Sequence, residues 1–239
     1  MPTLIAQHLD EVRRRIAAVA AAAGRDPASV QLLAVSKTFP ADALRTAHAA
    51  GQQAFGENYV QEALDKIAAL QPLRASLEWH FIGPLQSNKT RPVAEQFDWV
   101  HSIDRLKIAH RLSEQRPAHL PPLNVCVQVN VSGEASKSGV APDEVATLAR
   151  DVAALPRLRL RGLMSIPEPV SGLHAQRALH RQLRELFDAV NAQGLGLDTL
   201  SMGMSADLDA AILEGATIVR VGTAIFGPRT YPTHGTTSL

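Results

Sequence analysis

A lysine closes an apolar run in the segment "VQLLAVSKTFP", and this position suggests chemistry. Residues 32 to 35 are apolar, and Lys37 follows them after a single serine. Burial disfavours an ammonium group, so a lysine at the end of a buried strand can lose its proton near neutral pH. A neutral amine attacks an aldehyde and forms a Schiff base. The alternative is that the strand surfaces here and the ammonium reaches water.

The other lysines of the chain have weaker claims on this chemistry. Lys66 and Lys107 fall in predicted helices among charged neighbours, where we expect solvated ammonium groups. Lys89 begins a predicted helix, and Lys137 lies in the loop "VSGEASKSG". Lys37 is therefore the candidate nucleophile.

A second chemical pattern lies near the C-terminus, where two segments could bind phosphate. In "SMGMSADLDAAILEGA" a strand leads through a glycine into a predicted helix with Ser205 as its expected N-cap, and helix N-termini bind phosphate. In "IVRVGTAIFG", Gly222 lets the backbone approach a ligand and Thr223 adds a hydroxyl. We expect Asp207 and Asp209 to point outward, because inward carboxylates would repel a phosphate. An ordinary serine cap followed by an ordinary glycine turn is the alternative.

These residues need a scaffold that gathers them at one end of a sheet. After an N-terminal helix over about Thr3 to Ala23, short runs of β-forming residues alternate with longer runs of helical spacing. This alternation favours a parallel sheet, and eight strands in 239 residues favour an α/β fold with one (β/α)8 TIM barrel over residues 1–239. A doubly wound open sheet is the alternative. The predicted strands are Gln31–Ser36, Ala54–Glu57, Glu78–Ile82, Trp99–Ile103, Asn124–Asn130, Arg159–Met164, Thr199–Met202 and Ile218–Val221. The predicted helices between them are Ala41–Ala50, Tyr59–Leu70, Asn88–Gln96, Arg105–Gln115, Pro142–Ala154, Gly172–Gln193 and Ala206–Glu214.

A barrel would place its site at the carboxyl ends of these strands, and the phosphate pattern falls on strands seven and eight, where barrels often bind phosphate. An aldehyde-reactive lysine beside a phosphate site fits pyridoxal 5′-phosphate (PLP), and it also fits a Schiff-base aldolase acting on sugar phosphates. Arg220 favours PLP, because it precedes Gly222 by two residues on the same strand face. An arginine facing the pyridine nitrogen would keep that nitrogen unprotonated and weaken the ring as an electron sink.

Composition excludes several other classes of function. A net charge of +1 without a long basic run gives no electrostatic case for nucleic acid. No apolar run approaches the ~20 residues that a membrane span needs, and we interpret the alanine-rich segment before Gly24 as an amphipathic helix rather than a signal peptide. The single cysteine, Cys126, is expected to be a small buried residue, and the histidines lack metal-ligand spacing. We therefore expect a cytoplasmic protein without a metal site.

Seven ordered motifs of the chain resemble those of the pyridoxal phosphate homeostasis protein family. They are "LLAVSKTFP", "GENYVQEA", "EWHFIGPLQSNK", "VNVSGEASKSG", "RGLMSIP", "LSMGMSADL" and "VRVGTAIFG", and together they span about residues 32 to 227. The resemblance implies a single-domain barrel like the N-terminal domain of alanine racemase, with PLP carried on Lys37. By the same motifs, Ser205, Gly222 and Thr223 would hold the phosphate, and Arg220 would face the pyridine nitrogen. The residues implied around the ring are Asn58, His80, Met202 and Met204.

The family resemblance implies PLP carriage without established turnover, in the balance of vitamin B6 and of amino and keto acids. PLP-dependent apo-enzymes would be the recipients, and the chain would be a monomer or a weak dimer. The residues of the chain also favour carriage without turnover, because two-base racemisation needs a second proton donor opposite the lysine. In alanine racemases this donor is a tyrosine from a C-terminal domain, whereas the tyrosines here, Tyr59 and Tyr231, have no clear claim on the cofactor. No catalytic residue is therefore assigned, and a slow PLP-dependent racemase or lyase is the alternative.

Overall fold

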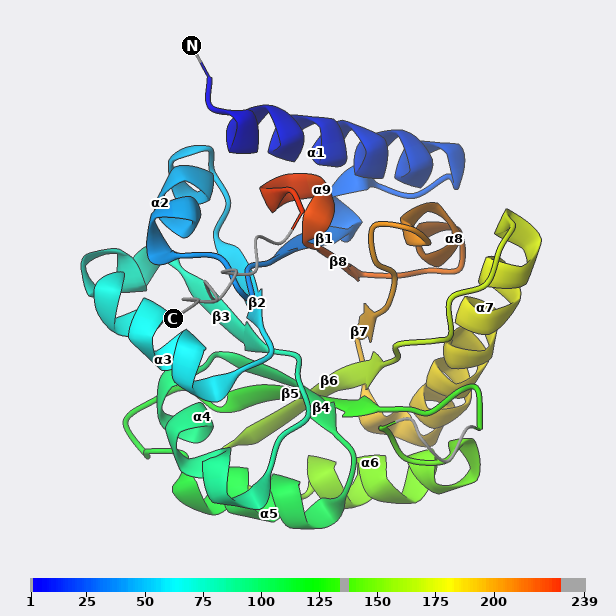
Figure 1. Ribbon diagram of the computed structural model, residues 1–239. Coiled ribbons are helices and arrows are strands. Elements are labelled where there is room, and N and C mark those ends of the chain that lie inside the picture. The colour runs from blue at the N-terminus through cyan, green and yellow to red at the C-terminus, as the bar shows by residue number, and fades with distance from the viewer. Residues whose placement is uncertain (1, 134–137, 229–239) are drawn as a thin grey trace, which may run out of the picture.

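Eight parallel strands close into a barrel, and each strand pairs with its neighbours in chain order (Figure 1). The computed structural model describes residues 2–133 and 138–228. The strands are β1 (Gln31–Val35), β2 (Ala54–Glu57), β3 (Glu78–Phe81), β4 (Trp99–Ile103), β5 (Leu123–Gln128), β6 (Leu158–Met164), β7 (Thr199–Ser201) and β8 (Ile218–Val221). The pairing of β1 with β8 closes the sheet, which confirms the predicted barrel and excludes the open doubly wound alternative.

Helices surround the barrel, as the alternating pattern predicted (Figure 1). They are α1 (Leu4–Ala22), α2 (Ala41–Ala49), α3 (Val60–Ala69), α4 (Thr90–Gln96), α5 (Leu106–Gln115), α6 (Val145–Ala153), α7 (Leu173–Val190), α8 (Leu208–Leu213) and α9 (Thr223–Phe226). Short helical turns occupy Pro27–Ser29, Gln71–Ser76, Ser87–Lys89, Pro142–Glu144 and Asn191–Leu195.

The N-terminal helix α1 packs beside α8 and α9 (Figure 1). The Thr3 side chain caps it by accepting a hydrogen bond from the Ala6 N–H at 3.2 Å. Gly24, with φ of 68°, lies in the left-handed conformation that ends many helices. One face of α1 is buried at helical spacing, through Leu9, Val12, Ile16 and Ala20. This extra helix therefore lies next to the loops that follow β7 and β8.

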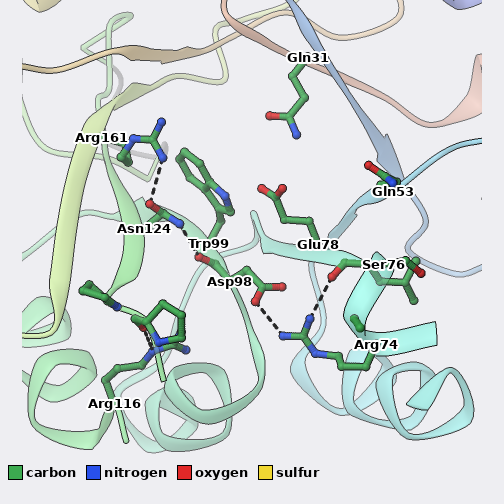
Figure 2. A pocket seen from close by; sticks show the side chains of 14 residues that line it. Gln31, Gln53, Arg74, Ser76, Glu78, Asp98, Trp99, Arg116, Asn124 and Arg161 are labelled. Carbon is green, nitrogen blue, oxygen red and sulfur yellow. Dashed lines mark hydrogen bonds and ion pairs between the residues drawn. The ribbon is translucent and has the colours of Figure 1, made fainter. Parts of the chain in front are cut away.

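The amino ends of the strands surround an open pocket of about 780 Å³ (Figure 2). Gln31, Glu78 and Trp99, from the starts of β1, β3 and β4, are among its lining residues. Barrel enzymes place their chemistry at the opposite end, where the strands finish.

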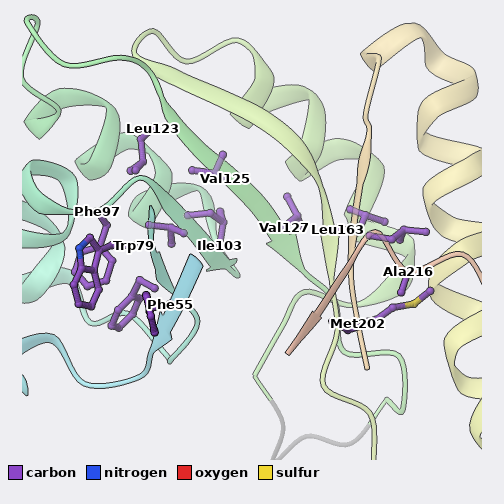
Figure 3. Close-up of a cluster of buried hydrophobic side chains, with 14 of the residues drawn as sticks. Phe55, Trp79, Phe97, Ile103, Leu123, Val125, Val127, Leu163, Met202 and Ala216 are labelled. Carbon is purple, nitrogen blue, oxygen red and sulfur yellow. The ribbon is translucent and has the colours of Figure 1, made fainter. Parts of the chain in front are cut away.

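The apolar core has two parts, one on each side of the sheet. The larger part fills the space between the strands and the helices, and Figure 3 shows some of its members, including Phe55, Trp79 and Phe97. The smaller part lies inside the barrel and contains Leu33, Ala54, Ile82, Trp99, Cys126, Met164 and Ile218. Cys126 is fully buried, as predicted, and burial raises the pKa of its thiol to about 12.

Several element boundaries differ from the predicted ones. The fifth strand ends at Gln128, although Val129 still forms an isolated parallel bridge with Val140. The eighth strand covers Ile218–Val221, as predicted, but the short helix α9, which the pattern missed, follows it. Within the described ranges, no helix has the length and apolar character to cross a membrane. Nor do these ranges contain a group of three or more His, Cys, Asp or Glu side chains that could hold a metal ion.

Candidate cofactor site at the carboxyl ends of the strands

A pocket of about 270 Å³ lies where β1, β2 and β8 end. Its lining residues are Val35, Lys37, Phe39, Asn58, Ile82, Ile166, Met204, Ser205, Ala206, Arg220, Gly222 and Thr223. The structure therefore brings together seven of the residues predicted around PLP, namely Lys37, Asn58, Met204, Ser205, Arg220, Gly222 and Thr223. The larger pocket at the amino ends contains none of them.

Charged side chains of α3 hold the turn that carries Lys37. Thr38 has φ of 70°, a left-handed conformation that costs free energy for a residue with a branched side chain. Its N–H donates to Glu62 Oε1 at 2.5 Å, and Lys66 Nζ donates to the same oxygen at 2.5 Å. These bonds hold the strained backbone immediately after Lys37.

Lys66 is buried, so the prediction of a solvated ammonium was wrong. Its Nζ donates to the Ser36 carbonyl at 2.8 Å and to Glu57 Oε1 at 2.7 Å. Glu57 also accepts from the Ser36 hydroxyl at 2.6 Å. Burial raises the pKa of Glu57, while the Lys66 ammonium and the Ser36 hydroxyl act in the opposite direction. A buried ion pair therefore fixes the backbone on the other side of Lys37.

Arg220 is a buried cation beside the same pocket, only 3% exposed. Its Nη1 donates to Ser201 Oγ at 2.7 Å, and its Nη2 donates to the Ser165 carbonyl at 2.7 Å. Burial lowers the pKa of Arg220 to about 10, which leaves the guanidinium charged at neutral pH. Because both acceptors are uncharged, neither of them neutralises the positive charge beside the pocket.

Two features show that a polar ligand fits this pocket. Asn58 Oδ1 is buried and has no hydrogen-bond partner among the described residues, so it is a free acceptor. A Cβ at Gly222 would lie 3.1 Å from the Val35 carbonyl, so only glycine leaves this edge of the pocket uncrowded. Lys37, Arg220, Asn58 and Thr223 together supply an amine, a cation, an acceptor and a hydroxyl, a donor set that suits PLP.

The segment before α8 departs from its predicted structure. The helix begins at Leu208, so Ser205 is not its N-cap but part of the preceding turn. Asp207 closes this turn, since its Oδ1 accepts from the Met204 N–H at 2.6 Å. Its Oδ2 lies 3.0 Å from Nε2 of His180, whose side chain is fully buried. Asp207 therefore turns toward α7 and does not line the pocket, in agreement with the expectation that it points away from the predicted phosphate site.

Helix α1 contacts both segments whose residues were predicted to bind phosphate. Arg15 pairs with the outward-pointing Asp209 at 2.8 Å and donates to the Ser205 carbonyl at 3.3 Å. His8 Nδ1 lies 3.0 Å from the Ile225 carbonyl in α9. The N-terminal helix therefore helps to position Ser205 and α9.

Two predicted residues do not line the pocket. Met202 belongs to the outer core, because side chains alternate along a strand and the preceding Ser201 reaches inward to Arg220. His80 lies inside the barrel, stacked on Trp99 with ring centroids 5.3 Å apart and 2.9 Å from His101.

Two pocket residues had no predicted role. Phe39 and Ile166 follow β1 and β6 in irregular segments, and both lie within the family motifs, but their residue types alone gave no reason to place them at the cofactor. Phe39 stacks on Phe226 of α9 with ring centroids 5.1 Å apart, so it joins the first loop to the last helix.

We expect Asp207→Asn to lower the free energy of unfolding by about 1–2 kcal/mol at pH 7. Burial acts to raise the pKa of Asp207, but the hydrogen bonds from His180 and the Met204 N–H outweigh it and hold the pKa below its ordinary value. The stabilisation is therefore present above the unfolded pKa of about 3.9 and is lost as the pH falls through the lower folded pKa. Urea unfolding at pH 7 and below pH 4 measures the difference between variant and wild type, which should shrink in acid. Asp209→Asn, at an exposed ion pair, should cost less than about 1 kcal/mol, and an equal cost would contradict the assigned role.

The chain forms one closed parallel barrel with a lysine after the first strand and an arginine on the eighth, and a family model identifies the class of this barrel. The family model described as "Alanine racemase, N-terminal domain" matches residues 7–230. The chain is 67% identical over 227 residues to the pyridoxal phosphate homeostasis protein of Pseudomonas aeruginosa, covering 95% of this chain and 96% of that protein. It is 58% identical over 228 residues to the protein of the same name from Escherichia coli K12, covering 95% and 97%. The chain belongs to the pyridoxal phosphate homeostasis protein family.

The fold is similar to that of a solved relative with its cofactor. The structure of PipY from Synechococcus elongatus with PLP bound superposes with a TM-score of 0.80 at 39% sequence identity. The match covers 93% of this chain and 100% of the PipY chain.

Proposed function

We propose that this chain carries PLP as a Schiff base on Lys37 and acts in the intracellular homeostasis of PLP and of amino and keto acids, without established catalytic turnover. The observation that carries the proposal is that Lys37 lines the same pocket as Arg220 and Thr223. The amine of Lys37 matches the aldehyde of PLP, and the buried cation of Arg220 matches its ring nitrogen. The hydroxyl of Thr223, beside the crowded Gly222, matches its phosphate. The names of the relatives and the PLP-bound structure of PipY support this assignment.

Several pocket residues have a proposed role toward the cofactor. Bound PLP supplies an aldehyde and an electron-withdrawing ring. Thr223 and Ser205 bind the phosphate beside the backbone of Gly222. Arg220 faces the ring nitrogen and, as a second cation there, disfavours its protonation. Asn58 accepts a hydrogen bond from the cofactor through its free Oδ1.

Carriage rather than turnover is supported by the groups around Lys37. Racemisation by two bases needs a proton donor on the face of the substrate opposite the lysine. In the described part of the chain, the pocket lining includes no tyrosine, and Tyr59 is 56% exposed at the start of α3. The residues in place thus suit a protein that holds an aldehyde more than one that moves protons on both faces.

We further infer that PLP-dependent apo-enzymes in the cytoplasm receive the cofactor. A Schiff base is reversible, so a carrier that uses one can release its aldehyde to another amine. The pocket lies at the carboxyl ends of the strands, and the exposed side chains of Ile166 and Met204 are part of its wall, which gives a recipient access to the cofactor.

The test is an absorption spectrum of the purified protein with added PLP, before and after borohydride. We expect a visible Schiff-base band that borohydride removes, leaving a pyridoxyl group on the chain. A colourless protein that binds no PLP would contradict the proposal and favour the aldolase interpretation. Incubation of the PLP-loaded protein with L-amino acids in deuterated water tests turnover, and sustained exchange at Cα would favour the racemase or lyase alternative.

A further inference from the structure

A row of polar side chains crosses the barrel interior beneath the pocket. Arg220 Nη1 lies 2.7 Å from Ser201 Oγ, and the same oxygen lies 2.8 Å from His101 Nδ1. His101 Nε2 lies 2.9 Å from His80 Nδ1. All four residues are at most 3% exposed. Buried polar groups cost free energy unless each is satisfied, so this row needs an explanation beyond packing.

The far end of the row reaches the pocket at the amino ends of the strands. His80 Nε2 lies 2.8 Å from Glu78 Oε1, an electrostatic contact rather than an aligned hydrogen bond. Figure 2 shows Glu78 and Trp99 close together in that pocket. Burial acts to raise the pKa of Glu78, but His80, Trp99 and Arg161 outweigh it and hold the pKa below its ordinary value. The row therefore begins at a cation and ends at an anion.

The two ends determine where the protons of the row lie. A guanidinium only donates, so Ser201 Oγ accepts from Arg220 and places its own proton on the remaining neighbour, His101 Nδ1. His101 then carries its proton on Nε2 and donates to Nδ1 of His80. The Nε2 proton of His80 consequently faces the carboxylate of Glu78.

The opposite order of protons is less favourable. Ser201 would accept twice, and its own proton would have no acceptor among the hydrogen bonds of the described residues. A neutral His80 would also turn a lone pair toward Glu78. Burial, together with the neighbouring His80 and Arg220, holds the pKa of His101 well below its ordinary value, in agreement with a neutral ring.

We propose that Ser201, His101 and His80 are positioning residues for Arg220. Their hydrogen bonds run in one direction, hold the guanidinium beside the pocket and keep both imidazoles in the neutral Nε2–H tautomer. The positive charge of the row then stays on Arg220, next to the place proposed for the cofactor ring. Only the consequence for PLP rests on the proposed function, because the proton arrangement is a property of the chain alone.

The proton arrangement can be measured without cofactor. In the ¹⁵N-labelled protein without PLP at pH 7.5, we expect His80 and His101 to show one protonated nitrogen each, at Nε2, in long-range ¹H–¹⁵N spectra. Ser201→Ala removes the donor to His101 Nδ1 and should release that ring from a single tautomer. Ser102→Ala is the matched control, because Ser102 is buried on the same strand as His101 and its hydroxyl has no partner among the described residues. An imidazolium, or an Nδ1–H tautomer of His101 in the unsubstituted protein, would overturn the proposal.

The consequence for the cofactor is measured by PLP release. Loss of one hydrogen bond to a charged group should speed release from Ser201→Ala about tenfold relative to the unsubstituted protein, with a changed visible spectrum. Ser102→Ala should match the unsubstituted protein in both measurements. Equal release from the two variants would overturn the positioning role. If the unsubstituted protein binds no PLP, the proposed function fails while the tautomer measurement still decides the proton arrangement.

Discussion

Lys37→Ala should abolish the borohydride-trappable adduct while the barrel remains folded. Lys37 is the lysine that lines the pocket beside Arg220 and Thr223, and alanine leaves no amine there to form a Schiff base. Added PLP would then be held only by noncovalent contacts to its phosphate and ring. The measurement is mass spectrometry of the borohydride-treated protein, supported by the visible spectrum and by PLP retained on gel filtration.

Lys107→Ala is the control for this prediction, because Lys107 is exposed on α5, away from the pocket. It should keep the full adduct and the full visible band. A band that survives in Lys37→Ala would mean that another lysine holds the cofactor. Lys137 would then be examined first, although it lies outside the described residues.

The fold followed from the sequence because local patterns carry most of its information. Strand positions were predicted to within about two residues, since a buried parallel strand is a short apolar run with polar ends. Lys37 and Arg220 could be identified as candidate site residues for a related reason. A charged side chain in or beside a buried apolar strand is unusual unless it has a function. Gly222 was informative because a glycine directly after a strand suggests a close approach, and the structure places the Val35 carbonyl 3.1 Å from where its Cβ would lie.

Contacts between distant segments could not be predicted in the same way. Lys66 appeared solvated because its helix contains other charged residues, yet the barrel buries it against Glu57 from a neighbouring strand. His180 and Asp207, 27 residues apart, meet only because α7 packs beside the turn before α8. His80 was placed at the cofactor by motif, whereas its position on β3 directs it into the barrel toward His101. For both histidines the missing information was the partner across the fold, and for Lys66 it was the packing of its helix against the strand that carries Glu57.

Lys66→Met should lower the free energy of unfolding by about 3–5 kcal/mol, the largest effect that we expect on stability. Methionine fills a similar volume but leaves the fully buried Glu57 carboxylate with only the Ser36 hydroxyl among the hydrogen bonds described here. For a chain of this size the loss corresponds to a fall in Tm on the order of 10 °C. Calorimetry and urea unfolding measure it, and Lys107→Met on exposed α5 should cost less than about 0.5 kcal/mol.

The pH dependence of the Lys66→Met deficit identifies the cause. Without the ammonium, burial raises the folded pKa of Glu57 above its unfolded value of about 4.3. The deficit should therefore be small below pH 4, where Glu57 is protonated in both states, and should grow as the pH rises through the folded pKa. Glu57→Gln combined with Lys66→Met should recover much of the loss, because it removes the unpaired charge. A deficit independent of pH, without recovery in the double variant, would mean that Lys66 acts through packing alone. The turn bearing Lys37 would then owe its position to contacts other than this ion pair.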